Sequence, residues 1–169
     1  MLKISVLSIL SIVGESLNIN EELKIDNISV GRDAVKVNRP ISIKGVFTNI
    51  GGNIFDFEGS VSTGLNLFCD RCMCDVDYEM DFSVSERFSS GFDECSDEEI
   101  KKINGHVVDL TDIVLEGIVI NIPMKVLCDP KCKGLCSKCG ANLNKISCEC
   151  DTTNIDPRFE VQKDFFNNN

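Results

Sequence analysis

The chain has 169 residues, a formal net charge of −10 and 43% hydrophobic residues. This is enough for one globular core and at most a small additional lobe. A chain so acidic is not expected to bind nucleic acid through its overall charge, so any RNA contact must be local. Its ten cysteines are not expected to form a secreted disulfide scaffold, because the apolar N-terminal segment lacks a small-residue cleavage site. That segment is also too short to cross a bilayer. We therefore expect a cytoplasmic protein with reduced cysteines and no membrane partner.

Residues 28–86 are predicted to form an antiparallel sheet. Apolar and polar residues alternate within 35–47 and again within 76–84, which is the pattern of half-buried strands. Between these runs, residues 50–53 read Ile-Gly-Gly-Asn, and such residues tolerate the positive φ angles of a hairpin turn. The N-terminal residues 2–13 are expected to form a strand or another buried segment.

One helix is predicted beyond the sheet. Residues 89–105 contain a cluster of acids and are expected to form a solvated loop with a short helical turn. Apolar residues then follow helical spacing from Leu110 onward, with Asp109 available as a cap and Pro123 as the end of the helix. The expected fold class is α+β, an antiparallel sheet with a core helix and a C-terminal Cys-rich zinc knuckle.

The composition predicts three consecutive regions. Residues 1–127 are expected to form the α+β core domain, which includes the knuckle of Cys69 and Cys72. Residues 128–150 are rich in Gly, Lys and Cys, with too few large apolar residues for a core of their own, so a metal ion would have to hold them together. Residues 151–169 are polar and are expected to be largely disordered.

Eight of the ten cysteines occur in pairs separated by one to three residues. A tight turn between two cysteines presents two thiolates to one tetrahedral zinc ion, so this spacing predicts zinc. We favour two Cys₄ sites, because the first two pairs are attached to the predicted sheet and helix whereas the last two pairs form a local set. The first site would comprise Cys69, Cys72, Cys128 and Cys132, and the second Cys136, Cys139, Cys148 and Cys150. The alternative is a single mixed site of Cys132, Cys136, Cys139 and either Cys148 or Cys150.

Nothing else in the sequence predicts catalysis. Cys74 and Cys95 are assigned no role, although Cys74 lies close enough to the first knuckle to substitute for Cys72. The single histidine, His106, is expected to be a solvated turn residue. Closed all-cysteine sites are structural in most cases, and the chain has neither a phosphate-binding glycine loop nor a Ser/His/Asp set. We therefore expect no enzymatic activity and no small-molecule substrate.

A local excess of positive charge surrounds the cysteines of the C-terminal half. Five lysines but only one acid, Asp129, occur between residues 125 and 145. These lysines could contact RNA phosphates, or they could only offset the charge of the thiolates. The stretch has no aromatic residues on which bases could stack. The candidate contact residues are Arg71, Lys131, Lys133, Lys138 and Lys145.

The motifs around these cysteines resemble the YceD family, whose members are described as large ribosomal RNA subunit accumulation proteins. The likeness rests on Cys-x-Arg-Cys at residues 69–72, on the predicted helix that ends in proline, and on the run from Leu127 to Asn144. That run reads Leu-Cys-x₃-Cys-x-Gly-Leu-Cys-x₂-Cys-Gly-x-Asn-Leu-Asn. The chain differs from many relatives at Ser137, where they have proline, and at Cys74, which is additional.

The resemblance implies a cytoplasmic bacterial factor that supports the accumulation of large-subunit ribosomal RNA. Its partner would be the large-subunit RNA precursor, a large-subunit ribosomal protein, or both. Family members that keep only the two pairs at Cys69–Cys72 and Cys128–Cys132 favour the first site over the mixed one. Two further functions stay open: an acidic zinc-binding adaptor that holds a basic ribosomal protein, and a metal-dependent nuclease.

Overall fold

The computed structural model of this chain describes residues 1–31, 33–90, 100–103 and 105–150. Two compact units divide the chain. The first, here called the sheet unit, comprises Met1–Leu67 and Asp75–Met124. The second, the cysteine unit, comprises Phe68–Cys74 and Lys125–Asn169, of which the described part ends at Cys150. This division places Cys69 and Cys72 with the C-terminal cysteines, whereas the sequence grouped them with residues 1–127. The expected disorder of 151–169 lies outside the described residues.

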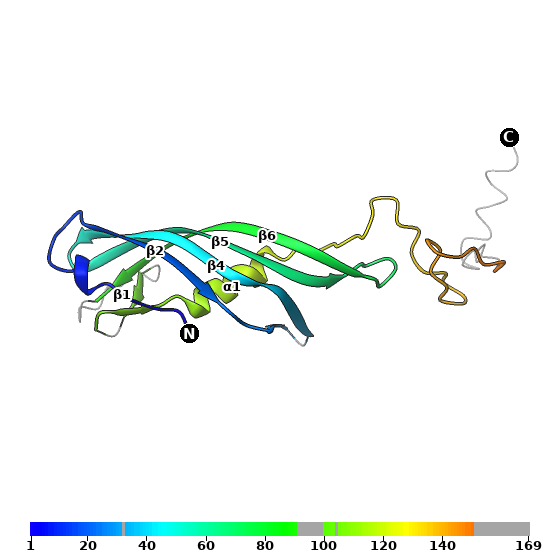
Figure 1. The fold of residues 1–169 in the computed structure, drawn as a ribbon, viewed down its shortest axis with the longest axis horizontal. Coiled ribbons are helices and arrows are strands. Elements are labelled where there is room, and N and C mark those ends of the chain that lie inside the picture. The colour runs from blue at the N-terminus through cyan, green and yellow to red at the C-terminus, as the bar shows by residue number, and fades with distance from the viewer. Residues whose placement is uncertain (32, 91–99, 104, 151–169) are drawn as a thin grey trace, which may run out of the picture. The chain divides into compact units, whose positions relative to one another are not determined.

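A six-stranded sheet forms most of the sheet unit (Figure 1). Its strands run in the order β2-β4-β5-β6-β7, and β3 also pairs with β4. The pairs β2–β4, β3–β4 and β4–β5 are antiparallel. The strand bounds are Ser16–Leu23 for β2, Asn27–Val30 for β3, Asp33–Gly51 for β4, Ile54–Phe68 for β5, Asp75–Ser89 for β6 and Ile100–Lys102 for β7. The predicted hairpin at residues 50–53 is confirmed, since Gly51, Gly52 and Asn53 all have positive φ between β4 and β5.

The last strand corrects the expectation of a purely antiparallel sheet. Strand β7 pairs with β6 in parallel, through Arg87 opposite Ile100 and the two pairs that follow. The sequence predicted a loop over residues 89–105, because three residues are too few to show an alternation of apolar and polar positions. Such an alternation also does not indicate whether a strand pairs with its neighbour in the parallel or the antiparallel direction. The sheet is therefore mixed.

A second, two-stranded sheet joins the N-terminus to the segment before the helix. Strand β1 (Lys3–Ser5) pairs antiparallel with β8 (Val107–Asp109) and is followed by the 3₁₀ helix η1 (Leu7–Ile9). The buried residues of this segment are Leu2, Ile4, Val6 and Ile9. The expected burial of residues 2–13 is therefore confirmed for residues 2–9.

Aromatic side chains fill the centre of the sheet unit. Phe47 on β4 lies opposite Phe57 on β5, and their ring centroids are 4.6 Å apart. Two residues further along the same face, Gly45 pairs with Gly59. A Cβ atom on Gly45 would lie 2.6 Å from Cε2 of Phe57, so the aromatic ring fills the space that two missing side chains leave. Phe88 on β6 completes this cluster, with its ring centroid 5.9 Å from that of Phe47.

The predicted helix is confirmed as α1 (Thr111–Asn121), which packs against β6 (Figure 1). Its approach is close at Gly117, where a Cβ atom would lie 2.6 Å from Cε2 of Phe82. The predicted cap is one residue off: the N-cap of α1 is Leu110, and Asp109 before it accepts the N–H of Thr111, 3.0 Å away. Among the residues that the structure describes, α1 is the one α-helix beside a predominantly β fold.

Candidate metal centre

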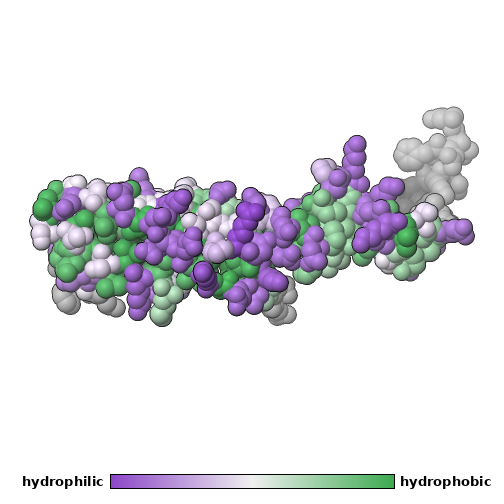
Figure 2. Space-filling view, viewed as in Figure 1, coloured by the Kyte–Doolittle hydropathy of each residue, from purple (hydrophilic) through white to green (hydrophobic). Residues whose placement is uncertain are grey.

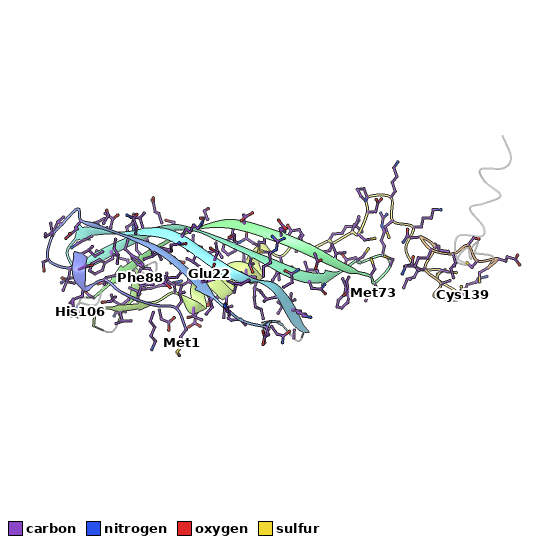
Figure 3. All side chains as sticks on the ribbon, viewed as in Figure 1. Met1, Glu22, Met73, Phe88, His106 and Cys139 are labelled. Carbon is purple, nitrogen blue, oxygen red and sulfur yellow. The ribbon has the colours of Figure 1, made fainter. Side chains whose placement is uncertain are left out.

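The turn between β5 and β6 carries the first two cysteines. The N–H of Cys69 donates to the carbonyl of Cys74 at 2.8 Å, and the N–H of Met73 donates to the carbonyl of Cys69 at 2.9 Å. Met73, labelled in Figure 3, has a φ of 56° and a largely exposed side chain. This tight turn holds Cys69 and Cys72 close together, and both are buried.

Asp70 joins this turn to the segment that carries the next two cysteines. Its N–H donates to the carbonyl of Val126 at 2.9 Å, and its Oδ2 accepts the N–H of Val126 at 2.6 Å. Two residues later the chain reaches Cys128. A further turn brings in Cys132, whose N–H donates to the carbonyl of Asp129 at 2.9 Å. Residues that are almost sixty positions apart in the sequence therefore meet in one site.

The sulfur atoms of Cys69, Cys72, Cys128 and Cys132 form the first group and lie within 4.8 Å of one another. The Sγ atoms of Cys69 and Cys132 are 3.9 Å apart, and those of Cys72 and Cys128 are 3.5 Å apart. Four thiolates at about 2.3 Å from a tetrahedral ion would be about 3.8 Å from one another. The two measured separations share no atom, so they are opposite edges of the tetrahedron, and both fit a metal ion of this size.

Cys136, Cys139, Cys148 and Cys150 form the second group, and their sulfur atoms also lie within 4.8 Å of one another. The N–H of Cys136 donates to the carbonyl of Ala141 and the N–H of Gly140 to that of Cys136, both at 2.9 Å. Gly140 has a φ of 70°, which favours glycine at this point of the turn. Cys139 is exposed and is labelled in Figure 3. Both groups have the soft, all-sulfur donor set that suits zinc, and either could hold a metal ion.

Each group contains a cysteine whose pKa is lowered and a cysteine whose pKa is raised. Burial works against ionisation of Cys69, but the backbone N–H groups of Cys128, Arg71 and Cys72 outweigh it and lower its pKa to about 6. The N–H groups of Cys139 and Lys138 likewise lower the pKa of Cys136 to about 6. In contrast, the neighbouring thiols raise the pKa of Cys128, that of Cys72 having the largest effect. The pKa of Cys150 is raised to about 12, chiefly by the thiol of Cys139. Four sulfur atoms so close together ionise fully only when a cation offsets their charge.

The backbone and side chain around Cys132 are also held by polar contacts. Nη1 of Arg71 donates to the carbonyl of Cys132 at 2.8 Å, and the carbonyl of Arg71 accepts the N–H of Leu135 at 3.0 Å. Nδ2 of Asn144 lies 3.2 Å from Sγ of Cys132. From the sequence, Arg71 is predicted only as a partner-contact residue and Asn144 has no predicted role, although both belong to the motifs around the cysteines. The regular spacing of cysteines did not indicate that these polar side chains would face a ligand.

Cys74 and His106 belong to neither group. Sγ of Cys74 is 3.2 Å from that of Cys72, but Cys74 is not among the four cysteines of the first group, whose sulfur atoms all lie within 4.8 Å of one another. Cys95 lies outside the described residues. His106 belongs to the sheet unit, where its carbonyl accepts the N–H of Val6 at 2.9 Å. Within the described part of the chain, His106 joins no group of potential metal ligands.

Charge is distributed unevenly between the units. The residue ranges of the sheet unit contain nine Lys and Arg against twenty Asp and Glu. Residues 68–74 and 125–150 of the cysteine unit contain six Lys and Arg against three Asp and Glu. The predicted contact residues Lys131, Lys133, Lys138 and Lys145 are all exposed there. Hydrophilic side chains cover much of the surface in view in Figure 2.

Comparison with known proteins places these features in a family. The family model described as "Large ribosomal RNA subunit accumulation protein YceD" matches residues 57–166. That range includes all eight cysteines of the two groups. The chain belongs to the YceD family. The family is named for the accumulation of large-subunit ribosomal RNA, not for an enzymatic reaction.

Individual relatives match over different lengths. "Uncharacterized protein YlbN" of Bacillus subtilis is 26% identical over 146 residues, which are 85% of this chain and 84% of YlbN. The chloroplastic "Large ribosomal RNA subunit accumulation protein YCED homolog 1" of Arabidopsis thaliana is 42% identical over 43 residues, 25% of this chain and 13% of that protein. The protein of the same name from Zea mays is 35% identical over 85 residues, 50% of this chain and 25% of that protein.

No solved structure is significantly similar to this chain. Among the residues that the structure describes, no helix has both the length and the apolar character needed to span a membrane.

Proposed function

We propose that this protein is a zinc-binding ribosome biogenesis factor that acts in the cytoplasm and supports large-subunit ribosomal RNA by binding rather than catalysis. Membership of the YceD family supports the ribosomal role. The observation that carries the metal assignment is the assembly of eight cysteines into two groups of four, each with its sulfur atoms within 4.8 Å. Zinc would bind both groups and would replace the core that the cysteine unit is too small to build.

The exposed lysines of the cysteine unit are the proposed contact surface. Two zinc ions would bring four positive charges to eight thiolates. Four of these cysteines are buried, namely Cys69, Cys72, Cys132 and Cys136. The lysine ammonium groups lie at the surface, where they can reach RNA phosphates. Arg71 would contribute less to partner contact, because its guanidinium already donates to Cys132.

The adaptor for a basic ribosomal protein is the second candidate. Strand β6 exposes one row of acids on the face opposite its buried residues: Asp75, Asp77, Glu79 and Asp81. Arg39 neutralises only Glu79, by an ion pair of 2.8 Å that is itself exposed. A row of this kind would attract a basic protein and repel RNA.

Electrophoretic mobility shifts against large-subunit RNA, at increasing salt, would separate the two candidates. Replacement of Lys131, Lys133, Lys138 and Lys145 by alanine should weaken RNA binding and lower its salt slope by up to about 3, at about 0.7 per lost phosphate contact. The matched control replaces four exposed lysines of the sheet unit, namely Lys3, Lys24, Lys36 and Lys44. An equal loss of RNA affinity in both variants would contradict the proposed contact surface. No shift at all, together with capture of a basic ribosomal protein that Asp77→Asn and Asp81→Asn abolish, would favour the adaptor.

Native mass spectrometry tests the metal assignment directly. The chain purified without chelators should carry two zinc ions, and a count of one would contradict the two-site arrangement. RNA cleavage that persists in a highly purified sample and disappears in Cys69→Ser would show that the protein is a nuclease rather than a binding factor.

A further inference from the structure

Asn144 belongs to one cysteine group by sequence and to the other by contact. It lies in the loop between Cys139 and Cys148, both members of the second group. Its side chain nevertheless reaches the first group, where Nδ2 is 3.2 Å from Sγ of Cys132. Cys132 is buried, with 4% of its surface exposed, so little water competes for its sulfur atom. Sulfur atoms of ligating cysteines accept N–H groups of this kind, which orient the ligand and stabilise the thiolate.

Every polar atom of the Asn144 side chain has a partner. Nδ2 donates to Oδ1 of Asn142 at 3.0 Å as well as to Cys132, and Oδ1 accepts the N–H of Lys133 at 2.8 Å. Rotation of the amide by 180° would place Oδ1 against the sulfur atom and Nδ2 against an N–H group. Both contacts would then be repulsive, so the hydrogen-bond network determines the orientation of the amide.

Two cysteines of the second group flank the loop that carries this side chain. The loop that carries Asn144 begins after Cys139 and ends at Cys148, so the second group closes it at both ends. The N–H of Leu143 donates to the carbonyl of Gly134, before the loop, at 2.9 Å. Within the loop, the N–H groups of Lys145 and Ile146 donate to the carbonyl of Asn142 at 3.0 Å. Without a metal ion at the second group, little apolar burial would hold this loop, because Ile146 is 59% exposed.

We propose that the two metal sites are coupled through Asn144, so that metal in the second group raises the metal affinity of the first group. The inference rests on the proposed binding of two metal ions. Metal in the second group closes the loop, the loop places the amide of Asn144, and the amide stabilises the thiolate of Cys132. Asn144 is thus a positioning residue for the first metal site. Coupling between two binding sites is reciprocal, so metal in the first group strengthens binding at the second by the same factor.

Metal titration of the full-length chain tests this coupling. Co²⁺ reports on thiolate ligation through its charge-transfer absorption, and competition with a chelator gives the affinity of each group. Loss of a hydrogen bond to a ligating residue lowers metal affinity by about 10- to 100-fold. Asn144→Ala should lower the Co²⁺ affinity of the first group by this factor while the second group is intact. Ser137→Ala, which alters an exposed side chain in the second group's own knuckle, is the matched control and should change neither affinity.

A double-mutant cycle separates coupling from a local effect of Asn144. The double variant Cys148→Ser, Cys150→Ser disables the second group and should itself lower the affinity of the first group about 10-fold or more. Adding Asn144→Ala to that variant should then have little further effect. Equal losses from Asn144→Ala with and without the second group would overturn the inference.

Two further results complete the test. Asn144→Asp keeps Oδ1 as the acceptor for Lys133 but removes the donor to Cys132, so it should reduce affinity even where the loop stays folded. Unchanged affinity in that variant would overturn the inference. Fewer than two Co²⁺ ions bound to the unchanged chain would overturn the two-metal proposal together with the inference, whereas two ions bound independently would overturn the coupling alone.

Discussion

Replacing Gly45 by alanine should destabilise the sheet unit, although alanine is the better residue for a strand in general. Alanine loses less conformational entropy than glycine on folding, which would favour the variant by about 0.5–1 kcal/mol. The added Cβ, however, would lie 2.6 Å from Cε2 of Phe57 and 2.7 Å from the carbonyl oxygen of Glu58. Phe57 is 1% exposed and stacks on Phe47, so its ring has little room to move. The carbonyl belongs to the backbone of β5, where a shift would disturb the pairing with β4.

Overpacking of this kind costs about 1–3 kcal/mol, and a contact with backbone belongs in the upper half of that range. The net loss should therefore be about 1–2.5 kcal/mol, which lowers Tm by about 2–10 °C for a chain of this size. Urea unfolding followed by circular dichroism at a fixed zinc concentration would measure it, with the slope m unchanged. Ser60→Ala, on the exposed face of β5, is the control and should stay within about 0.5 kcal/mol of the unchanged chain. If Gly45→Ala were as stable as the unchanged chain or more stable, the packing argument would be wrong.

Three other changes test different parts of the molecule. In native mass spectrometry, Cys74→Ser should still carry two metal ions per chain, whereas Cys72→Ser should carry fewer, because only Cys72 belongs to a group of four sulfur atoms. An equal loss of metal in both variants would show that Cys74 is a ligand. Asp109→Asn should lose about 0.3–1 kcal/mol of stability at pH 7, because it removes a negative charge beside the N-terminus of α1. The hydroxyl and N–H of Thr111 lower the pKa of Asp109 in the folded chain, so its contribution is present above the unfolded pKa of about 3.9 and disappears as the pH falls below it. A stability difference that persisted at low pH would contradict this account, and Glu116→Gln, at an exposed position in the middle of α1, is the control. Finally, removal of metal by a chelator should abolish hydrogen-exchange protection at residues 128–150 while β4 and β5 stay protected. Loss of protection in both units together would show that the sheet unit also needs the metal to stay folded.

Local sequence patterns predicted the parts of this protein in which the pattern repeats. The alternation within 76–84 predicted β6, the Gly-Gly-Asn turn predicted the hairpin, and the apolar spacing after Asp109 predicted α1. The strand and the helix are long enough for their periodicity to be counted, and the turn is indicated by residues that tolerate positive φ. Strand β7 was missed because its three residues show no periodicity, and its parallel direction depends on a neighbour that lies outside the local sequence.

The cysteine groups show the same distinction. Spacing alone indicated that Cys136 and Cys139 share a turn, since two residues separate them. It left open whether Cys132 joins that turn or the distant pair at Cys69 and Cys72. The structure brings Cys132 to within 3.9 Å of Cys69, because Asp70 binds the backbone of Val126 just before Cys128.

The sequence by itself thus determined the central strands β4 to β6, the helix α1, the metal-type donor set and the family likeness, all of which depend on residue types at short separations. Only the tertiary structure decided which pairs of cysteines share a site, which polar side chains face them, and where glycine is required by a neighbouring ring. These properties depend on distances between residues that are far apart along the chain. Asn144 makes the difference plain: its place in the sequence assigns it to the loop of one group, and folding places its amide on a sulfur atom of the other.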